Sequence, residues 1–286
     1  MKIKFIVIML CIFLFSSTFC IASKLSIDNN QETTNLDDVP VWNVGDYWVY
    51  SIDQLTVDFQ SSSQRIYIDG SIDDFKWTVS DTSGSTYTVD FTGKINANYE
   101  IYLSSPSLEF YITGTIKDTL TKLSGTIIFT KSDLQIQGIS GEIRGITMGK
   151  ISPLPFSLPL PFKAIIGGSL STPFPLFDFP LDTNKFWNMP DLTAQMSINA
   201  GGIFGLISIP MTATVNYGWT PLAFHCKNIQ QITVEAGTFD AWEIESTFFD
   251  LFSYYYAPDV GNLVKIDVTM DNGEFHGELK STNFIN

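Results

Sequence analysis

The chain has 286 residues, a formal net charge of −14, 44% hydrophobic residues and only 16% charged residues. So much apolar surface with so little charge excludes general disorder, because the chain can bury enough to offset the entropy of ordering. An acidic surface repels phosphate backbones and anionic headgroups, so nucleic acid is not an expected partner.

The first 22 residues have the three-part layout of a secretory signal peptide. Lys2 and Lys4 precede an apolar run over 5–15, and small residues surround Ala22. We expect an exported protein of the extracellular space or cell envelope, cleaved after Ala22. An uncleaved anchor is the alternative, although its apolar core is shorter than the roughly 20 residues of a membrane-spanning helix.

Residues 23–40 are polar and acidic and predict a flexible leader. A single β-rich domain is expected over 41–286. Its first strand follows a turn at Gly45, after which Trp48, Tyr50 and Ile52 share one face.

From 64 to 148 nearly every run alternates apolar and polar residues, which predicts strands with one dry and one wet face. Glycines recur inside these runs, as at Gly70, Gly93 and Gly114, with irregular spacing. Glycine inside a strand usually marks a bulge or bend. The predicted fold is therefore all-β: a large curved antiparallel sheet or an incomplete barrel.

A Pro/Phe-rich insertion over 151–190 breaks this pattern. Prolines cannot donate to an interior ladder, so the insertion is predicted to be loop or sheet edge that covers the sheet. Two interpretations stay open. The insertion either completes the core over the open end of the sheet, or is a movable lid that admits an apolar guest. Membrane contact is expected only through this insertion or the signal segment.

The C-terminal part predicts an antiparallel meander. Breaks at 236–237 and 258–261 separate strand-length runs. Asn272 and Gly273 favour a tight turn that would pair Met270 with Phe275 and place His276 opposite Thr269.

The sequence offers little for catalysis. His225 and His276 are its two histidines, and His225 points away from its neighbour Cys226 in a strand. Cys226 is alone once Cys11 and Cys20 leave with the signal, so no intramolecular disulfide is expected. No catalytic residue is predicted.

Cofactor and metal sites are likewise not predicted. There is no zinc-ligand spacing and no phosphate-binding glycine loop ahead of a helix. An enzyme would become the better interpretation if Glu243, Glu245 and His225 lay together in a cleft with perturbed titration.

Aromatic density is the strongest remaining signal, at 14% of residues. It is either the ordinary core of a β protein or the lining of a concave apolar surface that serves a ligand. The ligand-lining candidates are Trp42, Trp48, Trp77, Phe91, Phe110, Phe129, Phe174, Phe177, Phe179, Trp187 and Trp242. We expect a non-enzymatic protein that shelters a lipid or other apolar molecule. The alternative is a structural or interaction protein of the cell envelope with a packed core.

Three stretches carry a family resemblance: W-N-V-G-D-Y-W-V-Y at 42–50, G-T-F-D-A-W-E-I at 237–244 and Y-Y-A-P-D-V-G-N-L-V-K at 255–265. Residues 179–187 look like a degenerate second copy of the first stretch. This pattern resembles a group of secreted prokaryotic β proteins of unassigned activity. The group is architecturally similar to lipoprotein-carrier (Lol-type) open barrels, in which a curved sheet with a lid holds acyl chains. The resemblance implies no catalytic residues.

Overall fold

The described chain is almost entirely β-strand, which confirms the all-β prediction. The computed structural model describes residues 39–60, 64–105, 108–152, 154–188, 193–202, 207–216, 223–246, 252–270 and 273–284. The predicted signal and most of the leader, 1–38, lie outside the described residues. The strands are β1 (Tyr47–Gln60), β2 (Gln64–Asp81), β3 (Thr86–Ser105), β4 (Leu108–Ile116), β5 (Thr121–Thr130), β6 (Ile136–Ile151), β7 (Ser157–Phe174), β8 (Lys185–Asn188), β9 (Thr193–Gly202), β10 (Ile207–Asn216), β11 (Ala223–Val234), β12 (Gly237–Ser246), β13 (Phe252–Ala257), β14 (Asn262–Met270) and β15 (Gly273–Thr282). A short 3-10 helix, η3 (Pro258–Val260), separates β13 from β14.

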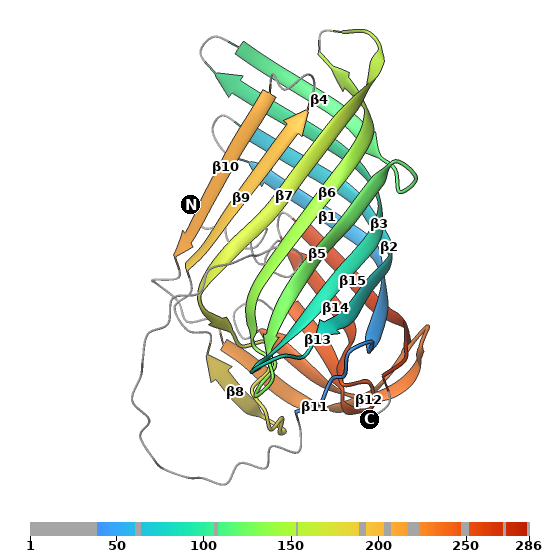
Figure 1. The fold of residues 1–286 in the computed structure, drawn as a ribbon, viewed down its shortest axis with the longest axis vertical. Helices are drawn as coiled ribbons and strands as arrows, with labels where there is room; N and C mark the ends of the chain where they lie inside the picture. Colours follow the sequence, from blue (N-terminus) through green and yellow to red (C-terminus); the bar gives the residue numbers. More distant parts are fainter. Residues whose placement is uncertain are drawn as a thin grey trace.

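All strands belong to one antiparallel sheet that curls strongly (Figure 1). Its order is β10-β9-β7-β6-β4-β3-β2-β1-β15-β14-β13-β12-β11-β8, so the first and last strands of the chain are neighbours. The predicted C-terminal meander is the run from β11 to β15. Long strands β6, β7, β9 and β10 rise on one side, while β8, β11 and β12 lie at the base (Figure 1).

Strands β4 and β5 occupy a single position between β3 and β6. β3 pairs with β4 through Ala97 and Ile116, and with β5 through Gly93 and Leu123. β6 likewise pairs with β5 along its first part and with β4 near its end. The two short strands therefore lie end to end, and residues 117–120 bulge out between them.

Part of the Pro/Phe-rich insertion, which was predicted to be loop or sheet edge, is the strand β7. β7 pairs with β6 along its length and with β9 from Phe162 to Leu170. Pro159 and Pro161 pair with Met148 and Ile146 of β6 and precede the stretch that pairs with β9. These prolines thus occupy a part of β7 with one described neighbour, where a missing N–H costs least.

The rest of the insertion crosses from one half of the sheet to the other. Residues 175–184, called here the crossing segment, connect β7 to β8, which pairs with β11 at the opposite end of the strand order. The prediction of a covering segment therefore applies to these residues.

The last hairpin has a different register from the predicted one. Met270 pairs with Gly273 and Val268 with Phe275, so residues 271–272 form the connection and His276 lies opposite Asp267. The displacement is two residues in total, which leaves every side chain on its predicted face because side chains alternate with a period of two.

Candidate functional site

Five of the ligand-lining candidates pack together. They come from β1, β2, β3 and β5 and from the residues ahead of β1. Trp42 lies 4.9 Å from Trp48 and 5.2 Å from Phe129 between ring centroids. Trp77 lies 6.1 Å from Phe129, and Phe91 reaches Trp77 through the ring of Phe75. Each of these five candidates is at most 5% exposed. They fill the interior with one another.

A second group of candidates packs at the base. Phe174 contacts Phe224 of β11, and Trp187 contacts the same ring at 5.6 Å. Phe177 lies 4.9 Å from Tyr256 of β13, and Phe179 contacts Tyr256 from another side. Phe179 and Trp242 are only partly buried. The side chain of Phe110 lies outside what the structure describes.

The crossing segment completes the core rather than forming a loose lid. Leu176, Phe177 and Leu181 of this segment are each at most 6% exposed. The Tyr254 hydroxyl donates to the Leu176 carbonyl oxygen at 2.6 Å. Lifting the segment would expose these three apolar side chains, each at a cost of roughly 1.5–3 kcal/mol. The core-completing interpretation of the insertion is therefore the one that the packing supports.

The aromatic core leaves little space. A cavity of about 20 Å³ lies beside it, lined by Tyr50, Ile52, Phe75, Trp77, Leu263, Ile266, Phe275 and Gly277. Ligand pockets usually measure about 300–1,000 Å³. The described aromatic candidates therefore act as core, and space for a ligand must be sought elsewhere on the same face.

That face continues beyond the core toward β4, at the end of the sheet away from β8 (Figure 1). Directly opposed residues of an antiparallel sheet share a face. One row runs Val57–Ile68–Tyr99–Gly114–Gly149–Leu158 across six strands, and another runs Ile66–Ile101–Ile112–Ile151. We call the aliphatic members of these two rows the aliphatic floor.

The floor is less enclosed than the core. Ile112 is buried, but Val57, Ile68, Ile101, Ile151 and Leu158 are only partly buried. They are apolar, inward-facing and still accessible. The sequence showed this alternation, but selection of candidates by aromatic content passed over it.

Tyr99 is the one aromatic residue in these two rows. A Cβ added at Gly114 would lie 2.4 Å from the Tyr99 hydroxyl oxygen, and one at Gly149 would lie 2.8 Å from it. The Tyr99 ring therefore lies over Gly114, and its hydroxyl shares the space over Gly149 with the side chain of Leu160. Burial raises the pKa of the Tyr99 phenol.

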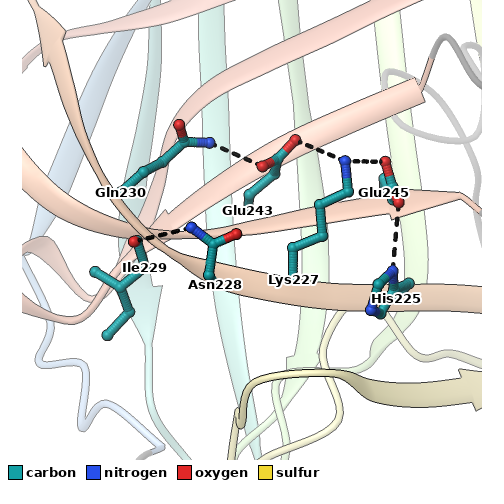
Figure 2. A network of polar contacts seen from close by, with 7 residues as sticks. All are labelled: His225, Lys227, Asn228, Ile229, Gln230, Glu243 and Glu245. Carbon is teal, nitrogen blue, oxygen red and sulfur yellow. Dashed lines mark hydrogen bonds and ion pairs between the residues drawn. The ribbon is translucent and has the colours of Figure 1, made fainter.

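The outer face of β11 and β12 carries a network of polar contacts (Figure 2). His225 Nδ1 lies 3.3 Å from Glu245 Oε1, and Lys227 Nζ lies 2.5 Å from Glu245 Oε2. Lys227 also contacts Glu243 at 3.3 Å, and Gln230 Nε2 donates to Glu243 Oε2 at 2.9 Å. His225, Glu243 and Glu245 do lie together, as an enzyme interpretation would require.

Their chemistry is that of a cross-strand ion-pair ladder. The hydrogen bond to Glu245 raises the pKa of Lys227, which favours the charged form of this amine. The neighbouring thiol is Cys226, which lies on the buried face of β11, and burial raises its pKa to about 11. Such a thiol is a poor nucleophile. The network holds β11 to β12.

His276 takes part in a similar cluster further along the sheet. Its Nδ1 contacts Asp267, and its Nε2 lies 3.3 Å from Glu278 Oε1. Among the described residues no group of three or more His, Cys, Asp or Glu side chains is arranged to hold a metal ion.

Within the described part of the chain, no helix has the length and hydrophobicity to cross a bilayer. Comparisons with protein-family models, with curated proteins and with solved structures each gave no match.

Proposed function

We propose that the protein is an exported, non-enzymatic binding protein that shelters the apolar part of a lipid or a similar molecule on the aliphatic floor. The observation that carries this proposal is the extension of the inward apolar face beyond the filled core. Ile68, Ile101, Ile151 and Leu158 remain partly accessible there, although side chains of that face are otherwise packed.

The shape of the floor favours an elongated apolar guest. Its two rows cross β1, β2, β3, β4, β6 and β7, and Tyr99 is the one aromatic residue in them. Such a surface binds a flexible hydrocarbon chain by burying it. Each methylene group removed from water contributes roughly 0.8 kcal/mol to the binding free energy. The resemblance to lipoprotein carriers points to the same class of ligand.

The proposal is tested by native purification of the exported protein followed by mass spectrometry for a co-purifying lipid, and by titration with a fluorescent fatty acid. Ile68→Gln and Ile101→Gln should weaken probe binding roughly tenfold or more, because each places an amide in the apolar site. Tyr102→Gln is the matched control, because Tyr102 follows Ile101 in β3 and is 36% exposed. Equal binding by all three variants would remove the floor as the site.

The packed aromatic core favours a second candidate, a structural or interaction protein of the cell envelope. The cavity of about 20 Å³ beside Trp77 agrees with that alternative. A protein that purifies without lipid and ignores acyl probes would support it over the binding function.

A further inference from the structure

We propose that the outer face of β5, β6 and β7 docks the protein onto an anionic lipid bilayer. This surface, called here the basic–apolar face, is on the opposite side of the sheet from the aliphatic floor. The proposal does not depend on whether the floor holds a ligand.

Three cations lie in one row across the three strands. Lys122 is directly opposite Arg144, and Arg144 is directly opposite Lys163. Like charges placed directly opposite destabilise a sheet. Glu142 offsets part of this repulsion, since its carboxylate lies 2.8 Å from Lys163 Nζ and 3.3 Å from Arg144 Nε. One carboxylate cannot neutralise three cations, and a row with net positive charge is unexpected in a chain of net charge −14 unless it meets an anionic partner.

Exposed apolar side chains adjoin this row on the same face. Ile146 pairs with Pro161 and Met148 with Pro159, and all four are exposed. Ile146 is 43% exposed and Met148 is 42% exposed. Lys150 follows on β6 and is also exposed. Along the strands, this face therefore presents the row of three cations, then two rows of apolar side chains, and then Lys150.

One more exposed apolar residue adjoins the face. Leu120, in the bulge between β4 and β5, is 46% exposed, and its carbonyl accepts from the Ile146 N–H. Carboxylates lie mainly further along the sheet, where Glu100 and Glu109 accept from Tyr111 and Tyr102. Asp118 of the bulge accompanies Lys117 and adds no net charge.

Charge complementarity and exposed hydrophobics together indicate a bilayer rather than a soluble polyanion. Lysine and arginine bind anionic headgroups electrostatically, while apolar side chains enter the boundary below them. A soluble polyanion would use the cations alone. The acidic remainder of the surface repels anionic headgroups. The protein therefore approaches a membrane with this face toward it.

The test uses the full chain and co-sedimentation with vesicles of phosphatidylcholine, with or without phosphatidylglycerol. Binding should require phosphatidylglycerol and weaken with added salt. The double variant Lys122→Gln with Lys163→Gln should bind roughly ten- to 30-fold more weakly, given the usual contribution of each cation near an anionic surface. The matched control is Lys94→Gln with Lys280→Gln, since these lysines both pair with Asp74 elsewhere on the sheet. It removes equal charge and should change binding less than threefold.

Ile146→Ser with Met148→Ser examines the apolar contribution and should lower partitioning roughly tenfold. If circular dichroism shows that this variant is unfolded, Met148→Trp replaces it, because Met148 is 42% exposed on this face, and the new indole should shift to shorter emission wavelength with vesicles. No binding to phosphatidylglycerol vesicles at low salt would overturn the proposal. So would an equal loss in the Lys94/Lys280 control. Binding to soluble polyphosphate as tight as to vesicles, with no loss in the serine variant, would assign the face to a polyanion instead.

Discussion

The indole N–H of Trp48 donates to the carbonyl oxygen of Val260 at 2.7 Å, across 212 residues of sequence. Trp42 makes the equivalent contact with the Gly261 carbonyl at 3.0 Å. The W-N-V-G-D-Y-W stretch and the P-D-V-G turn, which the sequence singled out separately, are therefore one structural unit. Gly261 at this turn has a φ of 58°, which glycine adopts without strain.

Replacement of Trp48 by Phe should lower the free energy of unfolding by about 1–3 kcal/mol more than replacement of Trp77 by Phe. Both indoles are buried, but the Trp77 Nε1 has no hydrogen-bond partner among the described residues. Only Trp48→Phe leaves a carbonyl without its donor. Urea denaturation measures both. Equal losses would mean that the Trp48 hydrogen bond contributes nothing net.

Gly114→Ala should destabilise the sheet by roughly 1–3 kcal/mol, because the added methyl group overlaps the Tyr99 ring. In a Tyr99→Ala background the same change should cost much less. A double-mutant cycle of melting temperatures measures the coupling. Additive effects would show that the ring does not lie over Gly114 in solution.

Asp74→Asn should destabilise the protein near neutral pH and have no effect in strong acid. Hydrogen bonds from Lys94 and Lys280 lower the pKa of Asp74 in the folded protein. Its stabilising contribution is therefore complete above its unfolded pKa of about 3.9 and is lost as the pH falls through the lowered folded value. The loss at neutral pH should be roughly 0.2–1 kcal/mol for each ion pair, because these groups are exposed.

The measurement is the unfolding free energy of the original protein and of Asp74→Asn as a function of pH, with Asp240→Asn as the control. Asp240 is exposed and has no ion pair within the described chain. A deficit of Asp74→Asn that persists unchanged in strong acid would contradict a role for its charge.

Cys226 should resist thiol reagents at pH 8 while the protein is folded, and react rapidly in denaturant. Its side chain is fully buried and its pKa is raised to about 11, so little thiolate exists and none is accessible. The measurement is absorbance after addition of an aromatic disulfide to a Cys11→Ser, Cys20→Ser background. Rapid reaction of the folded protein would show that β11 opens.

Alternation predicted most of the strands outside β7, because the residues of a half-buried sheet alternate between an apolar face and a polar face. The shared face of Trp48, Tyr50 and Ile52 and the meander around 236–237 and 258–261 are confirmed. The register of the final hairpin was not predicted correctly from local sequence. Asn272–Gly273 favoured a turn by its own chemistry, but pairing of β15 with both β14 and β1 fixes the register.

The candidate site was harder to predict for a related reason. Composition identified Trp77 and Phe129 as apolar and inward-facing, but their mutual contact depends on how the sheet curls. The prolines of β7 left loop and sheet edge open in the same way, because the choice depends on where β9 ends its pairing. His225 and Glu245 meet only through the register of β11 with β12.

The pairing of β1 with β15 determines when the molecule can finish folding. Thr282 Oγ1 donates to the carbonyl oxygen of Tyr47, 235 residues earlier in the sequence. During synthesis the opening strand has one side unpaired until the final strand has been made, so native structure cannot be completed progressively from the N-terminus. Contacts this distant in sequence make folding slow. Until β15 pairs with β1, the unpaired edge of β1 is where a chaperone would give most protection against aggregation.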